Sequence, residues 1–243
     1  MKSVLITGAS SGIGLKLAED YAKSGWKVVG CGRSMATLDA LAERFENLST
    51  LQFDTSDKKA CEEALVSIDS NLDLIILNAG TCEYIEGGLV DADLFQRVFT
   101  TNVFGVVNCL EVLQKTYTNG THIALMGSTA SYLGLPRAEA YGASKAAISY
   151  LARSLSVDLS HLGVTVSLIS PGFVRTPLTD KNDFPMPMMV TPEEASDTIR
   201  KGLEKQKEEI HFPRRFSFIL KFIAALPVWL QLVLVKRLVR NAS

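Results

Sequence analysis

The chain has 243 residues, of which 47% are hydrophobic and 21% are charged. A chain of this length and composition can bury a large core, and we expect one α/β domain over residues 1–243 instead of two small ones. The 25 Lys and Arg residues nearly balance the 26 Asp and Glu residues, so the formal net charge is −1. This balance excludes a global field that would attract nucleic acid or an acidic partner.

The cysteines, Cys31, Cys61, Cys82 and Cys109, are widely spaced and form no Cys-x-x-Cys pair. We therefore predict reduced thiols, no metal site and a cytoplasmic protein. The N-terminal apolar run is too short to be a secretory signal, so we expect no leader peptide.

The first predicted unit is a short strand from Ser3 to Ile6, a glycine-rich turn and a helix from Leu15 to Ser24. Glycines let the backbone approach a phosphate closely, and the start of a helix supplies free N–H groups. The candidate pyrophosphate-binding residues are therefore Gly8, Ser10, Ser11, Gly12, Ile13 and Gly14. The same letters also match Gly-x-Ser-x-Gly, the nucleophile elbow of serine hydrolases, in which Ser10 would be the nucleophile.

The second predicted strand, Lys27 to Cys31, is followed by Arg33, where a first βαβ unit would meet the ribose of an adenosine. An Arg suits a 2′-phosphate by its charge and its planar donors, so Arg33 favours NADP; a solvated loop Arg is the alternative. A helix from Met35 to Phe45 and a strand from Leu48 to Phe53 should follow. Asp54 is then either a turn residue or an acceptor near the adenine.

The helix predicted from Lys58 to Ile68 precedes a nearly continuous apolar run from Leu72 to Leu77, as expected for a parallel strand covered on both faces. Ligands bind at the carboxyl ends of such strands, where this chain has small residues that would admit a cofactor, namely Asn78, Ala79 and Gly80. Asp93 to Thr118 is predicted as one long helix. Asn102 lies in its interior, and the simplest explanation for this poor helix former is a buried amide bonded to backbone.

Two later strands also end in candidate site residues. The strand from His122 to Met126 precedes Ser128, whose hydroxyl could contact a substrate oxygen. The strand from Thr165 to Ile169 is followed by residues whose backbone and hydroxyl groups could hold a carboxamide, namely Pro171, Gly172, Val174 and Thr176.

Tyr141 and Lys145 are four residues apart and should lie on one face of a helix that continues through Ala146 to Leu162. A nearby ammonium favours the ionised phenol, so we expect Lys145 to lower the pKa of Tyr141 towards a range suited to proton transfer. An aromatic residue beside a solvated lysine is the alternative interpretation of this pair alone.

Taken together, these motifs resemble those of the short-chain dehydrogenases/reductases: Thr7-Gly-Ala-Ser-Ser-Gly-Ile-Gly14, Asn78-Ala-Gly80, Asn102, Ser128, Tyr141-x-x-Ser-Lys145 and Pro171-Gly172. The resemblance runs from about Ser3 to Thr176. It implies a Rossmann-type, doubly wound parallel sheet of about seven strands with helices on both faces, the last strand being Glu209 to Phe212.

The resemblance also implies roles for individual residues. Tyr141 would be the acid/base, and Lys145 would lower its pKa and bind the nicotinamide ribose. Ser128 would hold the substrate oxygen, and Asn102 would position a water linked to Lys145. Val174 and Thr176 would orient the nicotinamide carboxamide, and Arg33 would select NADP. Some NADP-preferring relatives carry a basic residue where this chain has Ser10 or Ser11, so NAD remains possible.

The segment after Thr176 is expected to contact the substrate. We divide the chain into a cofactor-binding and catalytic core (1–176), a substrate loop and helix (177–208), and a last strand with an apolar extension (209–243). The Met, Phe and Pro residues of Pro177 to Val190 suit an apolar substrate. Thr191 should cap the next helix, with Pro192 in its first turn.

Phe216 to Val235 is strongly apolar but is interrupted by Lys221 and Pro227, which favours two short helices. Its basic flanks and Trp229 suit a membrane surface, with contact through Phe216 to Val239. An oligomer interface, a cover for the substrate pocket and a spanning helix are the alternatives.

From these observations we expect an NAD(P)-dependent oxidoreductase that prefers NADPH and interconverts a small apolar ketone or aldehyde with its alcohol. We also expect a homodimer or homotetramer, with possible contact at the inner face of a membrane. Two other functions remain open. One is a non-catalytic nucleotide sensor or scaffold, although Tyr141 and Lys145 are both present. The other is a serine hydrolase, which is disfavoured by an elbow so near the N-terminus.

Overall fold

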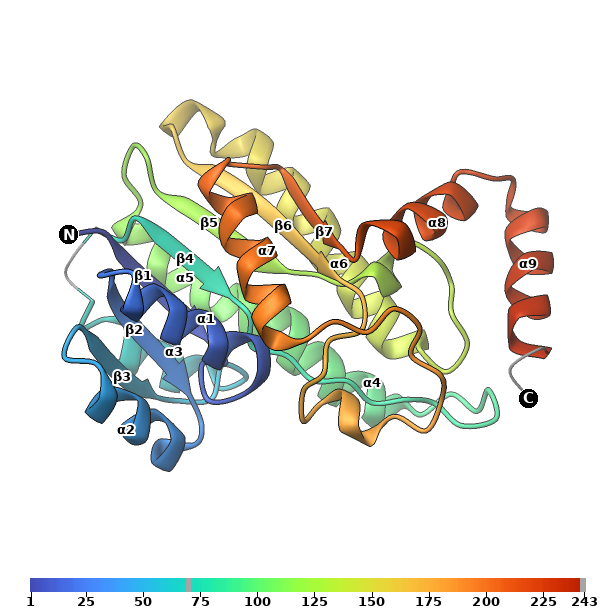
Figure 1. Ribbon diagram of the computed structural model, residues 1–243, viewed down its shortest axis with the longest axis horizontal. Coiled ribbons are helices and arrows are strands. Elements are labelled where there is room, and N and C mark those ends of the chain that lie inside the picture. The colour runs from blue at the N-terminus through green and yellow to red at the C-terminus, as the bar shows by residue number, and fades with distance from the viewer. Residues whose placement is uncertain (69–70, 241–243) are drawn as a thin grey trace.

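A computed structural model describes residues 1–68 and 71–240, with side chains described as far as residue 237 (Figure 1). The last residues of the predicted extension, 241–243, and the side chain of Val239 in the predicted membrane contact lie outside this description.

The described residues form a seven-stranded, entirely parallel sheet in the order β3-β2-β1-β4-β5-β6-β7. This order confirms the predicted Rossmann-type fold. The strand bounds are β1 Ser3–Thr7, β2 Lys27–Gly32, β3 Leu48–Gln52, β4 Leu74–Leu77, β5 His122–Met126, β6 Thr165–Pro171 and β7 Glu209–Phe212. The order reverses between β1 and β4, which is the point where open α/β sheets bind ligands.

Helices cover both faces of the sheet because successive strand side chains point to opposite sides. Val4 and Ile6 of β1 pack with one set of helices, whereas Leu5 between them packs with the other. In Figure 1 the first set, α1, α2 and α7, lies on one side of the sheet and the second, α3, α5 and α6, on the other. Their bounds are α1 Gly12–Lys23, α2 Met35–Arg44, α3 Lys58–Leu65, α5 Gly105–Leu113, α6 Glu139–Asp158 and α7 Pro192–Glu204.

The helix predicted from Asp93 to Thr118 is confirmed as a continuous helical segment over residues 92–116, but it is not α-helical throughout. The chain forms α4 (Ala92–Phe99), a π-helical turn (Thr100–Phe104) and α5. Asn102 lies inside this turn, and its side chain bonds to the backbone of the segment after β4. Single π-helical turns occur frequently at functional sites. Short 3₁₀ turns complete the described structure at Gln114–Thr116, Thr129–Ser131, Ser160–Leu162 and Thr179–Lys181.

The C-terminal region forms a capped helix, the edge strand β7 and two further helices. Thr191 and Glu194 make a reciprocal capping box at the start of α7, with Pro192 in the first turn, as predicted. The apolar extension is divided into α8 (Arg214–Ala224) and α9 (Val228–Arg240), which project at one end of the molecule (Figure 1). Pro227 lies at the break between them, as expected. Among the described residues, no helix combines the length and the apolar character needed to cross a membrane.

Candidate active site

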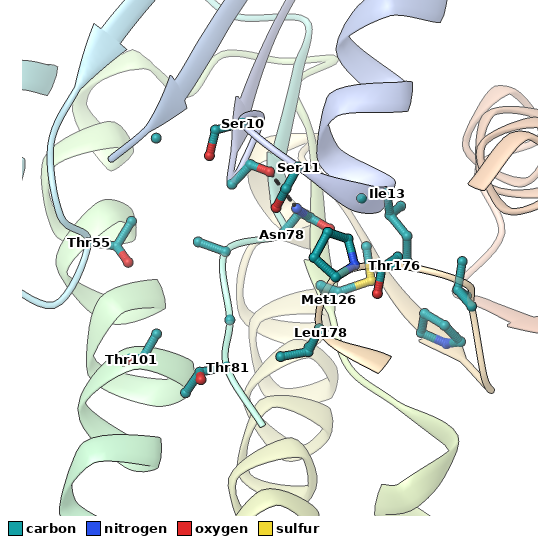
Figure 2. A pocket seen from close by; sticks show the side chains of 18 of the residues that line it. Ser10, Ser11, Ile13, Thr55, Asn78, Thr81, Thr101, Met126, Thr176 and Leu178 are labelled. Atoms are coloured by element: carbon teal, nitrogen blue, oxygen red, sulfur yellow. Dashed lines mark hydrogen bonds between the residues drawn. The ribbon is translucent and has the colours of Figure 1, made fainter. Parts of the chain in front are cut away.

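A groove runs along the carboxyl edge of the sheet, across the ends of β1, β2, β3, β4, β5 and β6. Of the candidate residues, the groove is lined by Gly8, Ser10, Ser11, Gly12, Ile13, Arg33, Asp54, Asn78, Ala79, Gly80, Ser128, Tyr141, Lys145, Pro171, Gly172, Val174 and Thr176. Figure 2 shows several of them, with Ser10, Ser11 and Asn78 near the glycine turn and Thr176 on the loop after β6. Gly14 and Asn102 are the candidates that do not line it.

The turn between β1 and α1 leaves no room for a side chain at its glycines. Gly8 and Gly12 have φ angles of 69° and 54°, a region that L residues rarely adopt. A Cβ at Gly14 would lie 2.2 Å from the carbonyl oxygen of Gly8 and 2.5 Å from the Nδ2 atom of Asn78. Gly14 therefore permits the close approach of helix and turn, although it does not itself line the groove. The first N–H groups of α1 have no intrahelical acceptor, and Gly12 and Ile13 at this end of the helix line the groove.

Hydrogen bonds fix the end of β4 against the end of β1. The Thr7 hydroxyl oxygen accepts from the backbone N–H groups of Asn78 (3.0 Å) and Ala79 (3.1 Å). In return, the Asn78 amide donates to the carbonyl of Thr7 at 3.0 Å. The two loops that line the centre of the groove are thus held as one unit.

Arg33 and Asp54 lie together at the end of the groove formed by β2 and β3. The Arg33 Nη1 atom is 3.6 Å from Asp54 Oδ2, and the Arg33 side chain is 77% exposed. Partial burial acts to raise the pKa of Asp54, but hydrogen bonds from Ser56 and the charge of Arg33 outweigh it and lower that pKa. Asp54 is therefore an ionised turn residue, and Arg33 is a cation largely open to solvent.

Asn102 lies behind the groove wall and is completely buried. Its Oδ1 atom accepts from the N–H of Thr81 (2.7 Å), and its Nδ2 atom donates to the carbonyl of Thr81 (2.9 Å) and to Ser144 Oγ (3.0 Å). The interpretation of Asn102 as a buried amide bonded to backbone is confirmed. This amide joins the segment after β4 to α6, one residue before Lys145.

Tyr141 and Lys145 lie one turn apart in α6, as expected, and both line the groove with Ser128. The Lys145 Nζ atom is 5.9 Å from the centre of the Tyr141 ring and donates to the carbonyl of Met126 at 2.9 Å. Lys145 is only 4% exposed. The Ser128 hydroxyl oxygen accepts from the N–H of Ala130, which fixes its direction at the end of β5.

Burial dominates the pKa values of this pair. It raises the pKa of Tyr141 well above its usual value; the neighbouring Cys82 acts in the same direction, whereas Ser128 opposes them. Burial also lowers the pKa of Lys145 to about 8. The pKa of Tyr141 is therefore raised in this structure, contrary to the expectation that it is lowered, because desolvation of the phenol and the neighbouring Cys82 outweigh the hydrogen bond with Ser128.

The loop after β6 closes the groove over the glycine turn. A Cβ at Gly12 would lie 2.9 Å from the Thr176 Cγ2 atom. Thr179 holds this loop, since its hydroxyl accepts from the N–H of Thr176 (2.9 Å) and donates to the carbonyl of Val174 (2.7 Å). Thr179 also lines the groove, but nothing in its sequence context indicated this.

Other lining residues missed in the sequence include Thr55, Thr81, Thr101 and Leu178, shown in Figure 2. Of these, Thr81 adjoins Asn78-Ala-Gly80 and could have been included by extending that motif by one residue. Thr101 lies in the π-helical turn, and sequence periodicity does not predict such a turn.

An aromatic cluster lies beside the groove and includes part of the predicted substrate loop. The ring of Phe184 is 5.1 Å from Tyr84 and 6.2 Å from Phe173, measured between ring centres. Phe173 also lies 5.7 Å from Phe216 of α8. Arg137 joins the cluster, with its guanidinium carbon 5.6 Å from the Tyr84 ring centre and 5.7 Å from that of Phe184.

The groove offers Ser10 no histidine partner, and the structure describes all three histidines. His122 is 2.7 Å from Ser167 within the sheet, and His211 is 2.6 Å from Ser217. His161 lies in an exposed turn after α6. The hydrolase interpretation of Ser10 therefore lacks its general base.

Comparison with known proteins agrees with this geometry. The family model for short chain dehydrogenases matches residues 2–185. An uncharacterised oxidoreductase of Myxococcus xanthus is 32% identical over 235 residues, covering 93% of each chain. The serine 3-dehydrogenase of Agrobacterium fabrum is 32% identical over 210 residues, covering 83% of this chain and 81% of that protein.

Among solved structures, a short-chain dehydrogenase of Sphingobium yanoikuyae in complex with NADPH has a TM-score of 0.79 and 26% identity. The match covers 90% of this chain and 92% of that one. The protein therefore belongs to the short-chain dehydrogenase/reductase family and is an NAD(P)-dependent oxidoreductase that acts on CH–OH groups.

Proposed function

We propose that this protein interconverts an apolar ketone or aldehyde with the corresponding alcohol, that it prefers NADPH, and that Tyr141 is its acid/base. The observation that carries the proposal is the meeting of Ser128, Tyr141 and Lys145 at one end of a groove whose other end is formed by the glycine turn and Arg33. One groove thus has the two parts that hydride chemistry requires, a dinucleotide site and a proton donor.

The residues present fit a dinucleotide. The pyrophosphate would lie against Gly8 to Gly14, where a Cβ would collide with the neighbouring backbone and the start of α1 supplies N–H donors. Arg33 would bind a 2′-phosphate, because its guanidinium lies at the end of β2 and is mostly exposed. The preference for NADPH rests on this residue, and NADH is the alternative cofactor.

The remaining candidates would hold the adenine and the nicotinamide. Asp54 lies at the adenosine end and is the proposed neighbour of the adenine. The proposed contacts of the nicotinamide and its ribose are Asn78, Ala79, Gly80, Tyr141, Lys145, Pro171, Gly172, Val174 and Thr176, which line the groove near the ends of β4, α6 and β6.

The proposed mechanism follows from the protonation states of the pair. The raised pKa of Tyr141 keeps its phenol protonated at neutral pH, which is the form that donates a proton to a carbonyl oxygen. Ser128 would hold that oxygen through its hydroxyl. Bound NADPH would supply the hydride for the carbonyl carbon. Lys145, which is charged below about pH 8, would stabilise the phenolate that remains.

Asn102 has a supporting role in this proposal. Its amide fixes the backbone of Thr81 and contacts Ser144, so it sets the position of α6 relative to β4. It would also position a water that links Lys145 to solvent. Both effects would keep the lysine ammonium directed at the groove.

The aromatic cluster supports an apolar substrate. Tyr84, Phe173 and Phe184 form continuous edge contacts beside Tyr141, and aromatic side chains favour apolar ligands. The segment Pro177 to Val190 adds methionines, which adapt to varied shapes. We therefore place the substrate between this cluster and Tyr141.

A carbonyl panel tests the proposal. The purified protein should consume NADPH with apolar ketones or aldehydes, and the loss of absorbance of the reduced nicotinamide measures the rate. Polar and charged carbonyls of the same size are the matched controls. Turnover only with the polar set, or faster turnover with NADH across the panel, would contradict the substrate class or the cofactor preference respectively.

We further propose a homodimer or homotetramer in the cytoplasm. Exposed apolar residues on the face covered by α5 and α6 support assembly, since Phe104 is 58%, Tyr150 76% and Val157 74% exposed. Four free thiols suit a reducing compartment.

We propose that residues 1–176 form the catalytic core and that residues 177–208 determine the substrate.

A further inference from the structure

Helices α8 and α9 carry apolar side chains on both of their sides. On the inner side, Leu220, Ile223 and Val235 are buried against Leu133. On the outer side, six residues are between 51% and 69% exposed: Phe218, Ile219, Phe222, Val228, Trp229 and Leu232. We call these six residues the outer apolar face. A helix packed on a globular core normally directs polar residues outward, so this face is unusual for a surface in water.

Specific bonds hold both helices in place, so the outer apolar face is a preformed surface. Lys221 of α8 pairs with Glu209 of β7 at 2.6 Å. The Gln231 amide of α9 donates to the carbonyls of Ala224 (3.0 Å) and Leu226 (2.7 Å) at the end of α8. These bonds fix the angle between the helices, which project away from the body of the molecule (Figure 1).

The charge of this region differs from that of the rest of the chain. Residues 210–243 contain six of the 25 Lys and Arg residues and none of the 26 Asp and Glu residues. Arg214 and Arg215 begin α8 and are exposed, and Lys236 and Arg237 are exposed near the end of α9. Arg215 precedes Phe218 by three residues and therefore lies on the same side of α8. Cations thus border the outer apolar face at both ends.

We propose that the outer apolar face docks on a membrane surface that contains anionic lipid. Aromatic and aliphatic side chains would enter the boundary between headgroups and acyl chains, and the flanking cations would pair with lipid phosphates and carboxylates. Long Lys and Arg side chains can keep their charges at that depth.

The same charges disfavour a second copy of the chain as the occupant. In a symmetric dimer both subunits use the same surface patch, so the basic residues that border the face in one subunit would lie opposite those of the other subunit. Like charges facing each other oppose association, whereas anionic lipid supplies the complementary sign. The proposal is independent of the reaction, since binding to lipid needs neither cofactor nor substrate.

Vesicle sedimentation with the full-length protein tests the proposal. The protein is mixed with vesicles of phosphatidylcholine, with or without about 30 mol% phosphatidylserine. The test variant is Phe222→Asp with Trp229→Asp. The control variant is Val66→Asp with Leu89→Asp, which adds the same charge at apolar positions that are 66% and 79% exposed on other surfaces. Circular dichroism establishes that each variant is folded.

The wild type and the control should bind the anionic vesicles, and the test variant should bind about tenfold or more weakly. Binding should also weaken as salt rises, because the headgroup contacts are screened. Failure of the wild type to bind, or equal binding by the wild type and the test variant, would overturn the proposal. Equal affinity for neutral vesicles would overturn the anionic assignment. Conversion of a wild-type dimer to a monomer by the test substitutions, measured by analytical ultracentrifugation, would identify a second copy as the occupant instead.

Discussion

Burial shifts the pKa values of Tyr141 and Lys145 in opposite directions, because it disfavours the charged form of each group. A phenol loses its proton to become charged, so its pKa rises, whereas an ammonium loses its charge with its proton, so its pKa falls. The lysine is left as the group of this pair that titrates near pH 8. The protonation of Lys145 therefore governs how the pair responds to mildly alkaline pH.

The pKa of Lys145 has a consequence for stability. In the unfolded chain a lysine remains charged up to about pH 10.4, whereas in the folded protein Lys145 loses its proton near pH 8. Between these values the unfolded state binds more protons, so the free energy of unfolding should rise with pH, by at most about 1.4 kcal/mol per unit. Lys145→Met should lack this contribution, so the wild type should gain stability relative to the variant from pH 8 to 10.

Urea denaturation of both proteins across this pH range measures the difference. Lys145→Arg is a useful comparison, because it keeps a charge at the same position throughout. A constant stability difference between the wild type and Lys145→Met would show that the lysine keeps its usual pKa in the folded protein.

At the other end of the groove, Arg33 should distinguish the two nicotinamide cofactors. Arg33→Ala removes a cation that can form charge-assisted hydrogen bonds with a 2′-phosphate. We expect NADPH to bind about ten- to a hundredfold more weakly and NADH to change little. Fluorescence titration with both cofactors measures this effect, and Arg44→Ala on the neighbouring helix α2 is the control. Equal weakening for the two cofactors would refute the role of Arg33.

Among the elements, the helical segment α4–α5 shows what apolar periodicity misses: the length of the segment was predicted, but its π-helical turn was not. Apolar periodicity predicts a continuous helix because a π-helical turn shifts the pattern by only one residue. Asn102 lies in this turn, and its partners Thr81 and Ser144 lie 21 and 42 residues away in sequence. Such distant hydrogen bonds cannot be predicted from local propensity, although the misfit of an Asn among apolar residues was visible.

Arg137 links two loops that flank the aromatic cluster. Its guanidinium pairs with Asp183 of the proposed substrate loop (2.7 Å) and with Glu86 of the loop after β4 (2.5 Å). Its backbone has a φ of 64°, and its carbonyl accepts from the N–H of Ile85. Arg137 therefore joins the proposed substrate loop to the loop after β4, beside Tyr84.

Removal of this link should loosen substrate binding. Arg137→Met keeps an apolar stem but loses both ion pairs, whose partners are mostly exposed, so we expect KM for the carbonyl to rise about three- to tenfold. The affinity for NADPH should not change. Steady-state kinetics and a cofactor titration measure the two effects, and Arg44→Met, which breaks an exposed pair with Glu19, is the control. An unchanged KM would show that Arg137 only stabilises the loops.

At the scale of the whole molecule, the parallel sheet explains why motifs far apart in sequence could be combined into one site. Strands that run in the same direction end at the same edge, so the residues after β1, β2, β4, β5 and β6 must converge. The sheet, its last strand and most of the groove lining were predictable for this reason.

The pKa directions and the paths of the loops were not predictable. Whether the pKa of Tyr141 is raised or lowered depends on the atoms around its phenol, which the sequence does not reveal. The loop contacts of Arg137 and Thr179 likewise depend on backbone paths that follow no period. The break at Pro227 was predictable, since proline ends a helix.

The central claim is that Tyr141 donates and accepts the proton while the groove holds the dinucleotide. The most direct measurement compares wild type and Tyr141→Phe in two assays, NADPH binding by fluorescence titration and carbonyl reduction by loss of absorbance of the reduced nicotinamide. Loss of a general acid/base lowers turnover by about a hundred- to ten-thousandfold. We predict this loss of turnover with an NADPH affinity that stays within a few fold of the wild type, because Phe keeps all of the tyrosine side chain except the hydroxyl that donates the proton. Turnover within a few fold of the wild type in Tyr141→Phe would contradict the claim.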